Sequence, residues 1–166
     1  MNKIIVNDAK MKLSKEEAKR SAATHAEEGF LCSESVLMAL AECLGVSSNL
    51  IPRMATGFGA GIGRRGEICG ALSGAIMGVG LRFGRNQHIV HPNGKRPYWY
   101  ASQLIDLFVE TFGDSKCNNL IGLDLSRTED LKKYREYNVW NTKCRNFIEI
   151  ATEIAYDVIS SSTKEA

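Results

Sequence analysis

The sequence has 166 residues, of which 44% are hydrophobic, and a net charge of +2 at pH 7. This size and composition fit one globular domain and require no second one. Five cysteines are an odd number for a disulfide framework, and a chain of this length folds without one, so we expect no structural disulfides.

The beginning of the chain, MNKIIVNDAK, carries no apolar run of signal-peptide length. We therefore expect a cytoplasmic protein with reduced thiols, in which residues 1–13 form an N-terminal extension. Residues 43–105 contain seven basic side chains and one carboxylate, Glu67. This basic stretch either forms solvated loops or surrounds thiolates or an anionic ligand with positive charge. We expect no nucleic-acid partner.

The sequence predicts three helices in the first half of the domain. Ser14 followed by Glu17 forms a capping box, which predicts a helix that ends near Glu28, before Gly29. A second helix is predicted over residues 32–44, because apolar residues recur on one face and Gly45 follows. Pro52 suits the first turn of a short helix over residues 52–56.

A glycine-rich stretch, residues 57–63, predicts a flexible or tightly turned loop rather than regular structure. The helical pattern starts again at Gly66 and continues to Phe83, with glycine at every fourth position (Gly66, Gly70, Gly74, Gly78). Such a glycine stripe predicts another backbone close by, and we expect this helix to be central. Its apolar run of 14 residues is shorter than the ~20 that a membrane span needs, so we expect no membrane span.

The sequence predicts loops and further helices in the second half of the domain. We predict a loop over 85–97, a helix over 98–112, a short helix from about Lys116, a helix over 128–137, and a long helix to about Ile159 capped by Asn141. Residues 161–166 are expected to be a disordered tail. The sequence therefore predicts an all-α, single-domain bundle of about six to seven helices over residues 14–160.

Four cysteines fall at the predicted starts of helices: Cys32, Cys69, Cys117 and Cys144. Unpaired N–H groups and the helix dipole favour anions at a helix start, so each position should favour a thiolate. Four converging thiolates repel one another unless a metal, a cluster or oxidation neutralises them. Cys43 lies three turns beyond Cys32 on the same helix and is interpreted as a core residue.

The spacing of motifs excludes several kinds of site. The sequence has no C-x-x-C, which removes the usual zinc-ribbon and thioredoxin signatures, and no C-x-x-C-H, so we expect no haem. Residues 61–66 match G-x-G-x-x-G, but no strand precedes them, so we expect no dinucleotide. His88 and His91 are interpreted as exposed polar residues rather than metal ligands.

Three segments carry a resemblance to a known family: residues 29–36, residues 57–63, and above all residues 69–74 (CGALSG). On these segments the chain resembles the C-GCAxxG-C-C family of redox-active proteins, over roughly residues 14–160. Cys69 is the first residue of a CGAxxG motif that matches the family's motif at every fixed position. Cys32, Cys117 and Cys144 occupy the family's other three cysteine positions. The chain is also similar to the four-cysteine domain of split-Soret cytochromes, which holds an iron–sulfur centre in a dimer, beside haems.

The resemblance implies a redox or electron-transfer protein whose four thiolates hold an iron–sulfur cluster, with [2Fe–2S] as the first choice. Arg64 and Arg65 would offset its negative charge, and Gly70 would support the site. Two alternatives stay open: a metal-free thiol–disulfide or peroxide-type enzyme in which Cys69 attacks, and a module that binds zinc or another soft metal. The redox partner is not identified by the sequence, and the glycine stripe suits packing inside one subunit or across a homodimer.

Overall fold

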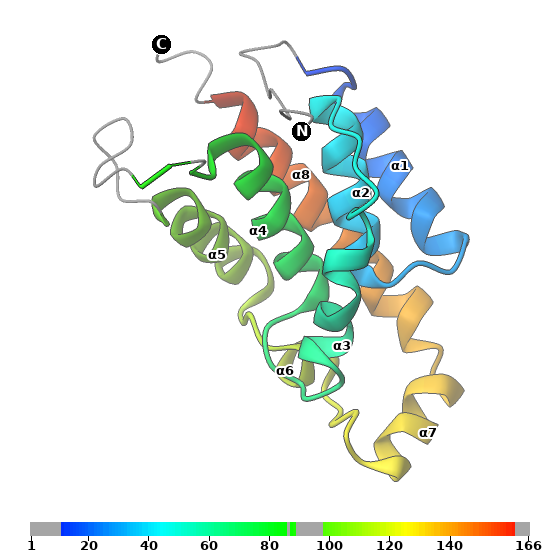
Figure 1. Cartoon of the computed structure of the whole chain (residues 1–166). Coiled ribbons are helices and arrows are strands. Elements are labelled where there is room, and N and C mark those ends of the chain that lie inside the picture. The colour runs from blue at the N-terminus through cyan, green and yellow to red at the C-terminus, as the bar shows by residue number, and fades with distance from the viewer. Residues whose placement is uncertain (1–10, 86, 89–97, 162–166) are drawn as a thin grey trace.

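The computed structural model describes residues 11–85, 87–88 and 98–161, in which the regular structure is helical apart from one isolated backbone bridge (Figure 1). The all-α prediction is confirmed, with more helices than the six to seven predicted. In chain order they are α1 (Lys15–Glu27), α2 (Cys32–Leu44), the 3-10 helix η1 (Arg53–Phe58), α3 (Gly59–Ile62), α4 (Gly70–Phe83), α5 (Trp99–Phe112), α6 (Cys117–Ile121), α7 (Thr128–Glu136), the π-helical segment η3 (Trp140–Cys144) and α8 (Arg145–Ser161).

The body of the molecule is a bundle of α1, α2, α4 and α8. Helix α2 packs on both α1 and α4, while α8 packs on α1, α2 and α4 and so closes the bundle. Helix α5 lies against α4 and α8 (Figure 1). The shared core consists of fully buried apolar side chains, among them Leu40, Leu72, Phe108 and Ile148.

Helix α1 begins with the predicted capping box. The Ser14 hydroxyl accepts a hydrogen bond from the Glu17 N–H at 3.3 Å, and the Glu17 carboxylate accepts one from the Ser14 N–H at 2.8 Å. The buried face of α1 consists only of alanines, Ala18, Ala22 and Ala26. Because these side chains are short, the helix can lie close to α2 and α8.

The glycine stripe of α4 faces α2. A β-carbon on Gly74 would collide with the backbone of Ser33, and one on Gly78 would collide with the side chain of Leu40. Next to the site, a β-carbon on Gly70 would collide with the sulfur of a cysteine on α2. The prediction that another backbone lies close to this stripe is confirmed, and α2 supplies it.

Helix α4 starts one turn later than the sequence pattern predicted. Gly66 lies outside the helix, at φ +74°, and Cys69 is the N-cap of a helix that begins at Gly70. The reason is that the backbone of Ile68 pairs with that of Lys116 in an antiparallel bridge. A residue paired in this way cannot also take part in the first turn of a helix. Local periodicity contains no information about this long-range pairing.

The glycine-rich stretch is tightly turned, as predicted, but a helix extends into it: the predicted helix over 52–56 is a 3-10 helix over Arg53–Phe58. The short segment α3 follows at Gly59, and the positive φ of Ala60 and Gly61 inside it makes it a left-handed turn and not a right-handed α-helix. Together with α6, α7 and η3, these segments form the end of the molecule opposite to the start of α1 and the end of α8 (Figure 1).

Parts of the sequence prediction lie outside the described residues. These are residues 1–10 of the N-terminal extension, most of the 85–97 loop, and residues 162–166 of the tail. The division into extension, domain and tail therefore stays a prediction. Within the described ranges, none of the helices combines the length and apolar character that crossing a membrane demands.

Two glycines of α4 provide a test of the close packing against α2. Gly74→Ala should lower the free energy of unfolding by about 2 kcal/mol, because the collision with α2 outweighs the helix propensity that alanine gains. Gly80→Ala is the matched control. Gly80 is exposed on the same helix, and a β-carbon there would meet no other atom, so alanine should raise the free energy of unfolding by up to about 1 kcal/mol. Urea unfolding followed by circular dichroism measures both values, and equal effects would contradict the packing.

Candidate functional site

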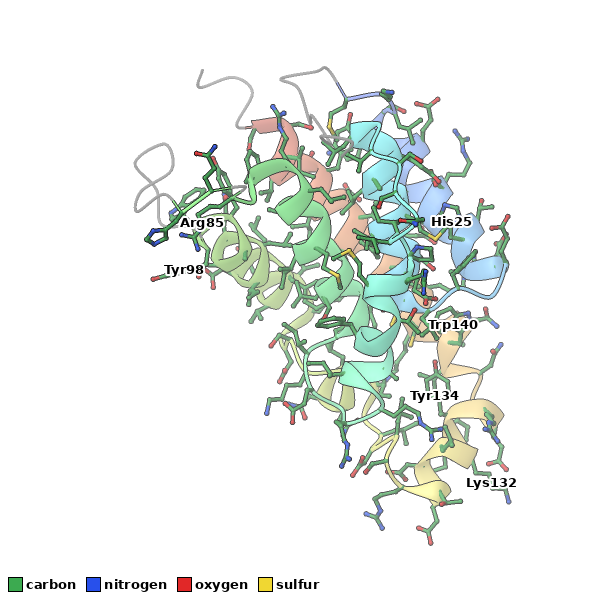
Figure 2. The ribbon with its side chains drawn as sticks, in the orientation of Figure 1. His25, Arg85, Tyr98, Lys132, Tyr134 and Trp140 are labelled. Atoms are coloured by element: carbon green, nitrogen blue, oxygen red, sulfur yellow. The ribbon has the colours of Figure 1, made fainter. Side chains whose placement is uncertain are left out.

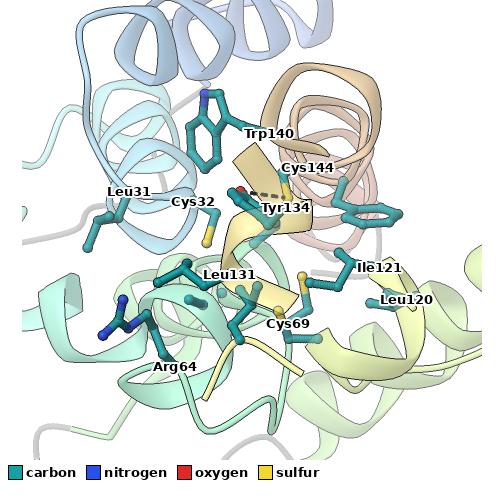
Figure 3. Close-up of a pocket in the computed structure, with 16 residues that line it drawn as sticks. Leu31, Cys32, Arg64, Cys69, Leu120, Ile121, Leu131, Tyr134, Trp140 and Cys144 are labelled. Atoms are coloured by element: carbon teal, nitrogen blue, oxygen red, sulfur yellow. Dashed lines mark hydrogen bonds between the residues drawn. The ribbon is translucent and has the colours of Figure 1, made fainter. Parts of the chain in front are cut away.

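One cavity at the end of the bundle is lined by four of the five cysteines: Cys32, Cys69, Cys117 and Cys144. It has a volume of about 160 Å³, similar to cavities of ~150 Å³ that take a benzene-sized guest in other proteins. Figure 3 shows sulfurs from Cys32, Cys69 and Cys144 around this space. The fold therefore brings together residues separated by 112 positions of sequence.

Cys32 is the first residue of α2. Glu34 fixes this helix start, since its carboxylate accepts hydrogen bonds from the Leu31 N–H at 2.8 Å and the Thr56 hydroxyl at 2.5 Å. Across the interface lies Gly70 at the start of α4, where a β-carbon would collide with the Cys32 sulfur. Gly70 thus lets the Cys32 thiol reach the cavity between the two helix starts.

Cys69 and Cys117 are held by a reciprocal pair of backbone hydrogen bonds. The Cys69 N–H donates to the Ser115 carbonyl at 2.8 Å, and the Cys117 N–H donates to the Glu67 carbonyl at 2.7 Å. A β-carbon on Gly61 would lie 2.7 Å from the Cys117 β-carbon, so a glycine is required there as well. Both cysteines are buried, which makes their positions part of the core.

Cys144 reaches the cavity from the last turn of η3. The prediction that Asn141 caps the final helix is wrong: residues 140–144 already belong to η3, which continues into α8. The chain turns three residues earlier, at Asn138, whose φ is +49°. Its side-chain oxygen accepts a hydrogen bond from the side-chain amide of Asn141 at 2.7 Å. Cys144 lies 3.5 Å from the hydroxyl of Tyr134 (Figure 3).

A left-handed turn borders the cavity at residues 60–64, five consecutive residues with positive φ. Ala60, Ile62 and Arg64 are not glycines, and each adopts this conformation against a steric penalty of ~1 kcal/mol. Arg64 and Arg65 are both exposed, but the turn carries only Arg64 to the edge of the cavity (Figure 3), and Arg65 does not line it. Residues 61–66, which match G-x-G-x-x-G, form this turn and not a strand-to-helix connection.

The structure contradicts the prediction that the helix starts favour thiolates in the metal-free chain. Burial raises the pKa of the Cys117 thiol to about 12 and that of the Cys144 thiol to about 11. It also raises the pKa of Cys32 and Cys69, although backbone N–H groups oppose this effect at both. Desolvation in an apolar cavity outweighs the field of a helix start, so all four are neutral thiols at pH 7.

The remaining candidates lie elsewhere. Cys43 is fully buried in α2 away from the cavity, and its interpretation as a core residue is confirmed. His88 is exposed, as predicted, and His91 is outside the described residues. In the part of the chain that the structure describes, no three His, Cys, Asp or Glu side chains lie close enough together to hold a metal ion. The four thiols surround the cavity without meeting at one point.

Sequence reasoning named Arg64 and Gly70, which do line the cavity, but missed its apolar and aromatic lining. Leu131 and Tyr134 line it from α7, Trp140 from η3 and Phe147 from α8. The available signal was the spacing of Leu131 and Tyr134, two apolar residues three apart in an otherwise polar helix. Figure 2 places Tyr134 on the bundle side of α7 and Lys132 at its outer end.

Comparisons with known proteins agree with this arrangement of cysteines. The family model described as "Putative redox-active protein (C_GCAxxG_C_C)" matches residues 30–158. An uncharacterised protein of Archaeoglobus fulgidus is 36% identical over 129 residues, which cover 73% of this chain and 85% of that protein. No solved structure matches the chain. The family match spans most of the chain and includes all four cavity cysteines, so this protein belongs to the C-GCAxxG-C-C family of redox-active proteins.

Proposed function

We propose that the protein transfers electrons by means of an iron–sulfur cluster, [2Fe–2S] as the first choice, held by Cys32, Cys69, Cys117 and Cys144. The observation that carries this proposal is the single cavity lined by these four cysteines, which arrive from four separate segments. Its lining contains no histidine and no carboxylate. A purely thiol donor set suits soft metals and iron–sulfur clusters.

The arrangement of the thiols also bears on the choice between a cluster and a single zinc ion. One tetrahedral zinc needs all four thiolates around one point, because each Zn–S bond is ~2.3 Å. In the described ranges no three His, Cys, Asp or Glu side chains are gathered as one metal ion requires, although four cysteines line one cavity. A [2Fe–2S] cluster needs only two cysteines at each iron, which suits thiols distributed around a cavity.

The surroundings suit a charged redox group in several ways. Apolar side chains such as Leu131, Trp140 and Phe147 line the cavity, and the exposed Arg64 at its edge adds a positive charge nearby. When bound, the cluster supplies a one-electron couple. Cys32 and Cys144 are only half-buried, so they offer the shortest route for an electron to and from solvent.

The metal-free alternative is less well supported. A thiol–disulfide enzyme needs an accessible cysteine with a low pKa, because the thiolate is the nucleophile. Cys69, its expected nucleophile, is 4% exposed, and burial raises its pKa. The raised pKa values of all four thiols also mean that a metal must displace their protons when it binds.

Metal content tests the proposed function. Protein purified or reconstituted without oxygen should be coloured and contain iron and sulfide. Cys69→Ser should lose most of both, because one of the four ligands is removed. Cys43→Ala is the matched control and should retain them, since Cys43 does not line the cavity. A colourless protein with stoichiometric zinc would overturn the cluster in favour of the zinc module.

Thiol reactivity tests the protonation state of the site in the metal-free protein. At pH 8, iodoacetamide should modify Cys144 about a hundredfold more slowly than a free cysteine, because a pKa of about 11 leaves little thiolate. The rate should rise about tenfold per pH unit up to that pKa, and Cys69 should react more slowly still. Peptide mass spectrometry measures each site, with guanidinium-unfolded protein as reference. Fast modification of Cys69 in folded protein at pH 7 would favour the thiol enzyme.

A further inference from the structure

We propose that Tyr134 is a positioning residue that donates a hydrogen bond to the ligand sulfur of Cys144 and thereby raises the reduction potential of the site. This inference rests on the proposed function. It assigns a role to a residue that is neither a cysteine nor part of the CGAxxG motif.

The contact itself is direct. The Tyr134 hydroxyl lies 3.5 Å from the Cys144 sulfur, and Figure 3 shows the two meeting inside the cavity. Both side chains line this cavity and both are half-buried. Water therefore has limited access to compete for either partner.

Packing, rather than the hydrogen bond alone, holds the tyrosine ring in place. Helix α7 has no fully buried residue, and it packs on the core through Leu131 and Tyr134, one turn apart. Figure 2 shows Tyr134 on the side of α7 that faces the bundle. Loss of the hydroxyl should therefore leave the ring where it is.

The direction of the hydrogen bond follows from the state of the sulfur. In the metal-free protein either the phenol or the thiol can donate. A cysteine that ligates a metal has lost its proton and only accepts, whereas a phenol keeps its proton at neutral pH. In the loaded protein, the Tyr134 O–H therefore donates to the Cys144 sulfur.

Such a donor stabilises the reduced state more than the oxidised state. Reduction adds one electron to the site, and the ligand sulfurs become more negative. A hydrogen bond is stronger when its acceptor carries more negative charge. No proton moves and no covalent bond breaks when the site is reduced. The hydrogen bond therefore stabilises the reduced state relative to the oxidised state, and the reduction potential rises.

Other hydrogen bonds at the cavity come from the backbone and cannot be removed by mutation in the same way. The Cys32 sulfur faces the N–H of Ala60, and that of Cys69 faces the N–H groups of Ala71 and Leu72. Tyr134 is thus a position where the chain can adjust the potential by a side-chain change without altering the four ligands.

The test compares Tyr134→Phe with Tyr137→Phe in protein loaded under anaerobic conditions. Tyr137 is 63% exposed just beyond the same helix, which makes it a control for loss of a hydroxyl. At a fixed potential near the wild-type midpoint, the ratio of reduced to oxidised protein should be about tenfold lower in Tyr134→Phe, equivalent to about 59 mV for a one-electron couple. Its thiolate-to-iron absorption should move to longer wavelength, because the sulfur becomes a stronger donor. Tyr137→Phe should match the wild type.

The outcomes separate this inference from the proposed function. Equal iron and sulfide in all three proteins, with a lower potential only in Tyr134→Phe, supports the inference. Equal loading with equal potentials and spectra overturns it and leaves the proposed function standing. Absence of iron from the wild type overturns both. If Tyr134→Phe loads poorly, an unchanged absorption of its loaded fraction overturns the inference.

Discussion

The close contact between α2 and α4 is the constraint on which the site depends. Two helices can approach this closely only where one of them lacks side chains, and Gly74 and Gly78 provide that gap opposite Ser33 and Leu40. At the end of the same interface Gly70 admits the Cys32 sulfur. The glycine stripe thus does two things at once, since it packs the core and it brings the start of α2 to the start of α4.

The other side of the cavity depends on backbone pairing instead of side-chain packing. Residues on either side of Ile68 and Lys116 exchange hydrogen bonds, which fix Cys69 opposite Ser115 and Cys117 opposite Glu67. This pairing brings the two cysteines from sequence-distant segments to one cavity. The left-handed turn at residues 60–64 then fits against Cys117 through Gly61. Strain in this turn is tolerated because packing and hydrogen bonds around it fix the backbone.

The sequence predicts the parts of this arrangement that have a local cause. Capping at Ser14, the glycine spacing in α4 and the exclusion of Cys43 all follow from neighbours within a few turns. The π-helical turn that contains Cys144 has no periodic signal in the sequence, although its contacts at Asn138 are local. The delayed start of α4 is not predicted either, because its backbone partner, Lys116, lies far along the chain. Tyr134 was missed for the same reason, since only the fold turns it toward a cysteine.

The prediction that the cavity cysteines are thiolates was wrong because two local effects act on the pKa of each thiol in opposite directions. A helix start offers a small, fixed stabilisation to an anion, and it does so at Cys32 and Cys69 through backbone N–H groups. Burial among apolar side chains acts on the same thiols and is the larger effect, so the cysteines of the metal-free chain are neutral. Under the proposed function the two effects would act in the same direction, because an apolar cavity strengthens the attraction between a metal and its thiolates. The four thiols would then lose their protons only when the proposed cluster binds.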